Sequence, residues 1–331
     1  MTVPAIEVCP GTLAEGFSSY SPACLRNLFN GKKVSHILPF ASAQTSEESA
    51  ALFIENRQRI SISGVQEKLS LRLEKNRLRL TAPGEHGLYL LKPIPRDVKH
   101  VAQVPANEHL TMQIARQVYG INTAENALIF FADGAPAYIT KRFDVKPDGG
   151  KRGKEDFASL AGKSRELGGE NFKYDSSCEE IGLLLQRYVP AWKVEIEKYF
   201  SLVVFNFLFS NGDAHLKNFS LLETPNGDYI LAPAYDLLNT HLHVDDDYFA
   251  LDRGLFADST KYRNRFHPSK PDFVEFGKRI GVSERRIEKL LTPFLEKQAM
   301  VESLVSRSFL DARSKRSYLL AYNTKRNYLT A

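Results

Sequence analysis

The chain has 331 residues, of which 43% are hydrophobic and 25% are charged, a composition typical of a folded globular protein. Its longest mostly apolar run, 199–209, is too short to cross a bilayer as a helix, and the first residues show no secretory signal. The net charge of +5 is modest, and three widely separated cysteines indicate neither a disulfide framework nor a structural zinc site. These features predict a cytoplasmic protein with no membrane partner.

Residues 1–145 are predicted to form a sheet-rich lobe with one prominent helix. The helix is expected over 107–119, where Pro105 and Asn107 open an apolar face and Gly120 closes it. Alternation of apolar and polar residues predicts strands at 69–73 and 78–80. A further strand is predicted at 88–92, where Pro93 ends it, and two more at 127–131 and 137–143, joined by an Asp-Gly turn.

Residues 146–331 are predicted to form a mostly helical lobe that begins with a glycine-rich linker at 146–154. Two short strands, 219–222 and 229–231, flank a Pro-Asn-Gly-Asp turn and predict a hairpin. Helices are expected at 194–209, 283–295 and 302–310. Together the two halves predict an α+β fold with two lobes.

The strongest chemical signal is a polar loop that directly follows the apolar helix. It runs Asn-Gly-Asp-Ala-His-Leu-Lys-Asn over 211–218, and Asp236 follows the hairpin beyond it. Phosphoryl transfer needs a carboxylate to orient and deprotonate the attacking hydroxyl, together with oxygen ligands for Mg²⁺. Asp213 can supply the first function, and Asn218 with Asp236 can supply the second. Ordinary turn capping and loop hydrogen bonds are the alternative, but the order of helix, loop, hairpin and carboxylate favours chemistry.

Three further features fit the same chemistry. Lys92 ends a predicted strand and can neutralise nucleotide phosphates. Glu108 in the next helix can hold it as an ion pair, or can simply be a first-turn glutamate that the helix dipole favours. A serine-containing turn at 60–68 can cradle a phosphate with backbone N–H groups, although it is also compatible with a simple strand entry. His215 can act as a base or a metal ligand, but supporting the loop is the simpler role for it.

Eight segments, in this order, resemble HipA-type toxin kinases. They are Ser-Ile-Ser-Gly-Val-Gln-Glu-Lys at 61–68, Leu-Lys-Pro at 91–93, Asn-Glu at 107–108, Lys-Arg-Phe-Asp at 141–144, Glu-Asp-Phe at 155–157, Lys-Tyr at 173–174, the loop at 211–220, and Ala-Tyr-Asp at 234–236. The resemblance runs from about residue 60 to residue 255. It implies a two-lobed protein-kinase-like fold that uses ATP and Mg²⁺ to phosphorylate serine on an aminoacyl-tRNA synthetase of the tryptophanyl or glutamyl type. That modification would stop charging and inhibit translation.

The resemblance also implies roles for particular residues. The catalytic group would comprise Asp213 as the base with His215 and Asn218, and Asn218 and Asp236 would be the Mg²⁺ ligands. The hinge against adenine would be formed by 141–143. Nucleotide contacts would come from Ser63, Gly64, Val65, Gln66, Lys68, Lys92, Lys141, Arg142, Phe143, His215, Lys217, Asn218, Tyr235 and Asp236.

Two departures from the HipA pattern suggest the short HipT form of a three-component toxin–antitoxin system. Only about sixty residues precede the serine loop, so a small HipS-like protein would replace the missing N-terminal subdomain. A HipB-like helix-turn-helix antitoxin would restrain the kinase and would carry any link to operator DNA. Both Ser61 and Ser63 are serines, as in HipT, which predicts regulation by autophosphorylation. Lys141 stands where HipA usually has Glu, so only its backbone role is expected to be retained.

Two other functions remain open at the level of sequence. A small-molecule phosphotransferase of the aminoglycoside or choline kinase type also uses Asp, Asn and a later Asp. A non-enzymatic pseudokinase would instead bind an antitoxin and DNA through the basic C-terminal region. The serine loop argues against the first alternative, and the retained Lys92, Asp213, Asn218 and Asp236 argue against the second.

Overall fold

The computed structural model describes residues 5–42, 68–82, 84–95, 98–146, 149–258, 262 and 266–330. The chain divides into two compact units, each assembled from several segments. The first unit comprises Met1–Gln113, Ala124–Gly149 and Ser303–Lys315. The second unit comprises Ile114–Thr123, Gly150–Glu302 and Arg316–Ala331.

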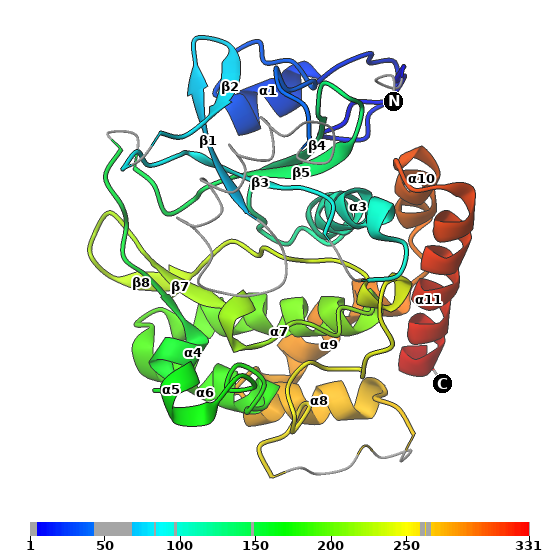
Figure 1. Ribbon diagram of the computed structural model, residues 1–331. Coiled ribbons are helices and arrows are strands. Elements are labelled where there is room, and N and C mark those ends of the chain that lie inside the picture. Colours follow the sequence, from blue (N-terminus) through cyan, green and yellow to red (C-terminus); the bar gives the residue numbers. More distant parts are fainter. Residues whose placement is uncertain are drawn as a thin grey trace. The chain divides into compact units, whose positions relative to one another are not determined.

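The first unit is built on an antiparallel sheet in the order β2-β1-β3-β5-β4 (Figure 1). All five strands lie where the sequence predicted them, to within two residues at each end. Their bounds are β1 (Leu69–Glu74), β2 (Arg77–Leu80), β3 (Tyr89–Lys92), β4 (Asn126–Phe130) and β5 (Pro136–Lys141). Leu71 pairs with Leu80 and with Tyr89, so apolar side chains of neighbouring strands share one face of the sheet.

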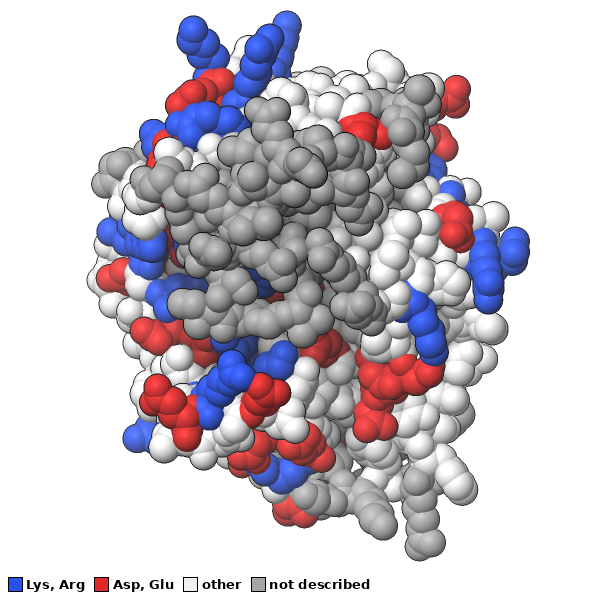
Figure 2. Space-filling view, viewed as in Figure 1, with Lys and Arg blue, Asp and Glu red and all other residues white. Residues whose placement is uncertain are grey.

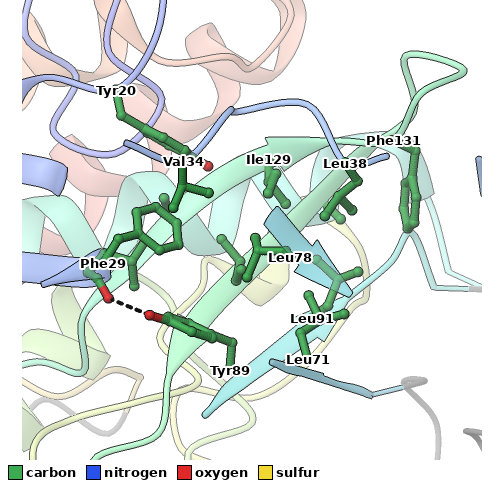
Figure 3. Packing of buried hydrophobic residues seen from close by; sticks show 14 of the residues in the cluster. Tyr20, Phe29, Val34, Leu38, Leu71, Leu78, Tyr89, Leu91, Ile129 and Phe131 are labelled. Atoms are coloured by element: carbon green, nitrogen blue, oxygen red, sulfur yellow. Dashed lines mark hydrogen bonds between the residues drawn. The ribbon is translucent and has the colours of Figure 1, made fainter. Parts of the chain in front are cut away.

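The core of the first unit lies between this sheet and the N-terminal segment (Figure 3). Helix α1 (Pro22–Phe29) begins with Ser21 as its N-cap and proline in its first turn, a favourable start for a helix. It contributes Phe29, whose ring packs between two aromatic neighbours. The ring centroids lie 5.3 Å apart for Phe29 and Tyr20 and 5.5 Å apart for Phe29 and Tyr89. The mixed composition of this segment gave no helix prediction.

Two helical elements follow β3, η1 (Val101–Gln103) and α3 (Val104–Gln117). Helix α3 begins three residues before the predicted position at 107. Pro105 therefore lies within the first turn, where its missing N–H has no intrahelical partner to lose.

The second unit surrounds α7 (Trp192–Leu208), which packs against α6 (Cys178–Tyr188) and α9 (Glu284–Leu295). This is the apolar helix predicted at 194–209. The predicted hairpin is also present, as β7 (Ser220–Glu223) and β8 (Tyr229–Leu231), with β6 (Lys154–Asp156) as a third strand in the order β6-β7-β8.

Several short or peripheral elements complete the described part of the chain. Helix α10 begins three residues before the start predicted at 302. The remaining bounds are α4 (Phe157–Leu160), α5 (Arg165–Gly168), η2 (Leu216–Asn218), η3 (Thr240–Leu242), α8 (Lys270–Arg279), α10 (Ala299–Arg307) and α11 (Ala312–Thr330). Within the described residues, no helix combines the length and apolar character needed to cross a membrane. The architecture is α+β, as predicted.

Candidate active site

The polar loop at 211–218 starts where α7 ends, and its first residues are tightly anchored. Asn211 donates its backbone N–H to the carbonyl of Asn206 at 2.8 Å and its side-chain amide to Asn206 Oδ1 at 3.0 Å. Gly212 donates its N–H to Thr240 Oγ1 at 2.8 Å, and that hydroxyl donates to the carbonyl of Ser210 at 2.8 Å. The entrance of the loop is therefore fixed by buried hydrogen bonds on both sides.

Asp213 presents its carboxylate to solvent from this anchored loop. Its side chain is 51% exposed, so a hydroxyl group from another molecule can reach it. The Tyr174 hydroxyl donates to Asp213 Oδ1 at 3.0 Å, and His215 Nε2 lies 3.9 Å from the same oxygen. The Tyr174 hydroxyl thus holds one carboxylate oxygen, and the His215 ring packs against Tyr174. This is the geometry that a general base requires.

His215 supports the loop as a neutral side chain. It is buried, and burial lowers its pKa to about 4 although the Asp213 charge opposes that change. Its ring packs edge-on against Tyr174 at a centroid distance of 5.3 Å. The imidazole therefore stays uncharged near neutral pH and packs between the loop and Tyr174.

Asn218 and Asp236 are brought together as predicted. Asn218 Nδ2 donates to Asp236 Oδ2 at 3.3 Å, and Asn218 Oδ1 accepts from the His215 N–H at 3.3 Å. Asp236 has a φ of 56°, in the left-handed region that is costly for a side chain other than glycine. The Asn211 amide holds its carbonyl at 3.4 Å. A strained, anchored backbone presents the carboxylate beside Asn218.

These two side chains suit Mg²⁺, which takes hard oxygen ligands and commonly uses one or two protein side chains together with phosphates and water. An amide and a carboxylate in hydrogen-bond contact can turn their oxygens toward one ion. Among the described residues, no group of three or more His, Cys, Asp or Glu is gathered for a metal. A site with a single carboxylate agrees with an ion that substrate phosphates would help to hold.

Tyr235 and Lys217, both predicted nucleotide contacts, are joined in the same region. The Tyr235 hydroxyl donates to the Lys217 carbonyl at 2.8 Å and also contacts the Ser220 hydroxyl. Lys154 Nζ lies 4.7 Å from the centroid of the Tyr235 ring, within cation–π range. The phenol thus ties the end of the catalytic loop to β7, directly before Asp236.

The predicted ion pair between Lys92 and Glu108 is present in the first unit. Lys92 Nζ lies 2.6 Å from Glu108 Oε1, and both side chains are almost fully buried, with 5% and 2% exposed. The Lys92 ammonium also lies 5.3 Å from the centroid of the Tyr138 ring. The ion pair and the surrounding protein therefore fix the position of the Lys92 ammonium.

The predicted hinge residues follow β5 in the same unit. Lys141 donates to Asn30 Oδ1 at 2.6 Å, and Arg142 pairs with Asp144 at 2.6 Å while its N–H binds the Leu88 carbonyl. Phe143 continues this segment, and Lys68 directly precedes β1. The predicted loop residues Ser61, Ser63, Gly64, Val65 and Gln66 lie outside the described part of the chain.

Sequence reasoning gave Tyr174 no role of its own. It lies 39 residues before Asp213, so no spacing rule connects the two. The segment is brought in by hydrogen bonds from Leu216 N–H to the Lys173 carbonyl and from Asp252 N–H to the Tyr174 carbonyl. Burial, and then the Asp213 charge, raise the pKa of Tyr174 and keep its hydroxyl as a proton donor.

Comparisons with known proteins agree with this arrangement. A family model for the HipA-like C-terminal domain matches residues 60–302. A Haemophilus influenzae protein named "Putative kinase" is 27% identical over 89% of this chain and 88% of its own length. A Sinorhizobium fredii protein with a similar name, Y4dM, is 32% identical over 58% of this chain and 48% of its own length.

A solved structure shows the same fold. It is that of Shewanella oneidensis HipA in a complex with HipB and operator DNA. The match has a TM-score of 0.59 at 20% identity and covers 81% of this chain and 63% of the HipA chain.

Proposed function

Because this chain belongs to the HipA-like C-terminal domain family, we propose that it is an ATP-dependent serine/threonine protein kinase that acts as the toxin of a toxin–antitoxin system. The observation that carries the proposal is the grouping of Asp213, Asn218 and Asp236 around one anchored loop. A half-exposed carboxylate and an adjacent amide–carboxylate pair supply the two sets of groups that phosphoryl transfer needs.

In the proposed reaction, the oxygen of a serine or threonine hydroxyl on the substrate attacks the γ-phosphorus of ATP. The Asp213 carboxylate accepts the hydroxyl proton, and the bond between the γ-phosphorus and the bridging oxygen breaks to release ADP. Neutral His215 and the Tyr174 hydroxyl keep the carboxylate in position during this transfer.

Asn218 and Asp236 would hold Mg²⁺, which when bound neutralises the charge of the nucleotide phosphates. Their own contribution is to present two oxygen ligands from a backbone that does not have to rearrange, since Asn211 already anchors Asp236. In the first unit, Lys92 would contact the phosphates while Glu108 keeps its ammonium in place.

The serine loop would cover the phosphates through Gly64, Val65 and Gln66. Ser61 and Ser63 would be autophosphorylation sites. A phosphoserine adds a charge of about −1.5 to −2, which would repel the triphosphate and reduce activity. Autophosphorylation would therefore limit itself.

For the biological partners we propose the set that the HipT-like pattern suggests. A helix-turn-helix antitoxin would restrain the kinase, as suggested by the HipB-bound state of the Shewanella protein. A small HipS-like protein would be a second partner, and an aminoacyl-tRNA synthetase of the tryptophanyl or glutamyl type would be the substrate. Operator DNA would be contacted through the antitoxin. On the face shown in Figure 2, Lys and Arg are interspersed with Asp and Glu over the described residues.

The decisive experiment is to incubate the purified chain with γ-labelled ATP and Mg²⁺ in the presence of each of the two synthetases and, separately, of cell lysate. Label should appear on serine or threonine of a protein and should fall at least about a hundredfold in Asp213→Asn and Asp236→Asn. Asp228→Asn, in the β7–β8 turn, is the matched control and should behave as the wild type. Label on a sugar or amine would instead support a small-molecule phosphotransferase. Nucleotide binding without turnover would support a pseudokinase.

A further inference from the structure

Lys325 is a charged residue in the buried face of the C-terminal helix. The buried positions of α11 are Ser314, Tyr318, Tyr322, Lys325 and Leu329, which repeat at helical spacing. Only 5% of Lys325 is exposed. A lysine is rarely buried to this extent without a compensating partner, so its charge calls for a structural reason.

Two aromatic rings enclose the Lys325 ammonium. Nζ lies 3.9 Å from the centroid of the Tyr248 ring and 5.2 Å from that of Phe207. Phe207 belongs to the last turn of α7, four residues before the catalytic loop begins. A desolvated ammonium over an aromatic face is attracted to it more strongly than an exposed one. Lys325 therefore binds the segment that contains Tyr248.

Asp246, two residues before Tyr248, lies directly against the catalytic loop. A β-carbon at Gly212 would lie 2.2 Å from Asp246 Oδ2 and 2.9 Å from the Asp247 carbonyl oxygen, so only glycine fits there. Both Asp246 carboxylate oxygens are shielded from solvent, and His241 Nε2 is 3.6 Å from Oδ1. The Asp246 carboxylate therefore packs directly against Gly212, the residue before Asp213.

Lys325 and Asp246 are close enough to influence each other. Burial lowers the pKa of Lys325 to about 8, and the Asp246 charge opposes that lowering. Burial raises the pKa of Asp246, and a hydrogen bond with Thr240, then the neighbouring His241 and the Lys325 ammonium, oppose that change. Each buried charge makes the other less costly, and removing either one leaves its partner uncompensated.

We propose that Lys325 is a positioning residue for the catalytic loop, holding the segment from Asp246 to Tyr248 against Gly212. The C-terminal helix thereby fixes the position of Asp213 without touching substrate. The kinetic part of this inference rests on the proposed kinase function, whereas the structural part does not.

The test uses the full chain and three variants. Lys325→Met keeps the length and apolar packing of the side chain but removes its charge, and Asp246→Asn removes the opposite charge at constant volume. The double variant combines them. Arg316→Met, at an exposed position of the same helix, is the matched control.

Hydrogen exchange of the peptide 210–218 is the primary measurement, because it does not depend on kinase activity. Exchange of this peptide should rise about tenfold in each single variant and not in Arg316→Met, and the double variant should add no further rise. The value of kcat should fall about tenfold, while the KM for ATP should change less than about twofold. The fall in kcat is smaller than the roughly hundredfold loss that a displacement of a full ångström causes.

Unchanged exchange of the loop in Lys325→Met, or a rise spread equally over the whole chain, would overturn the inference. Strictly additive effects in the double variant would also overturn it, because the two residues would then act separately. If Lys325→Met does not fold, Asp246→Asn and its exchange pattern decide the question. A wild type without kinase activity would reject the proposed function while leaving the exchange test intact.

Discussion

Replacing Tyr174 by phenylalanine tests whether the catalytic carboxylate has to be held in place. The change removes a single oxygen atom, whose hydroxyl donates to Asp213 Oδ1 at 3.0 Å. The ring remains and can keep its edge-on contact with His215. The variant therefore removes one hydrogen bond and leaves the surrounding packing in place.

The expected loss follows from the exposure of Asp213. A hydrogen bond to a charged group contributes about 1.5–3 kcal/mol when it is well shielded. The Asp213 side chain is 51% exposed, and water can replace part of the lost contact, so we expect about 1 kcal/mol, or roughly five- to tenfold in kcat. The KM for ATP should stay within about twofold, because the contact orients the base and not the nucleotide.

The assay is steady-state phosphorylation of the protein substrate over a range of ATP concentrations, with Tyr188→Phe as the control. Tyr188 is 40% exposed, so its hydroxyl is lost without disturbing the site. Equal kcat values for the two variants would refute the idea that Tyr174 orients Asp213. A loss of kcat accompanied by an equal loss of folded protein would refute it as well.

Four other outcomes are expected. Lys92→Met should lower the free energy of unfolding by about 3–5 kcal/mol in urea titrations, because it leaves the Glu108 carboxylate buried without its ammonium; a neutral effect would contradict this. Burial lowers the pKa of His109 to about 4, whereas the unfolded chain has a value of about 6.5 for this group. The contribution of His109 to the free energy of unfolding should therefore be constant above about pH 6.5. It should fall by up to about 1.36 kcal/mol per pH unit as the pH drops from about 6.5 toward 4. His109→Gln should flatten that slope in urea midpoints measured against pH, and an unchanged slope would assign it to other groups. Chelation of Mg²⁺ with EDTA should abolish phosphorylation, and added Mg²⁺ should restore it; activity that persists in EDTA would exclude the proposed metal role. Ser61→Ala with Ser63→Ala should give a kinase that no longer slows during incubation with ATP, whereas a time course like that of the wild type would exclude self-limitation.

The local parts of the fold could be read from sequence because their signals are local. Alternation predicted β1 and β2, flanking Pro and Asp-Gly signals delimited β3, β4 and β5, and the Pro-Asn-Gly-Asp turn predicted the β7–β8 hairpin. The start of α3 was placed too late, since a proline near a helix end can lie either before the first turn or within it. Helix α1 was missed because its eight residues are too few to establish a period.

The site was predictable to the extent that its residues lie in one short motif. Asn218 and Asp236 were expected to meet and do meet, and the Lys92–Glu108 ion pair, one of two interpretations of Glu108, is present. Tyr174 reaches Asp213 only through the course of the chain between them. The HipA resemblance includes the Lys-Tyr segment at 173–174, but no spacing shows that Tyr174 reaches Asp213, so the contact itself could not be predicted from the sequence.

The close approach of Gly212 to Asp246 has a consequence for the evolutionary record of this family. Gly212 does not have a positive φ, so its backbone conformation does not call for glycine. Glycine is required there because a β-carbon would collide with Asp246. A relative with alanine or serine before its catalytic aspartate would need a shorter side chain where Asp246 stands. The two positions should therefore change together across homologues, and the residue in the buried face of the last helix should lose its charge in those lineages.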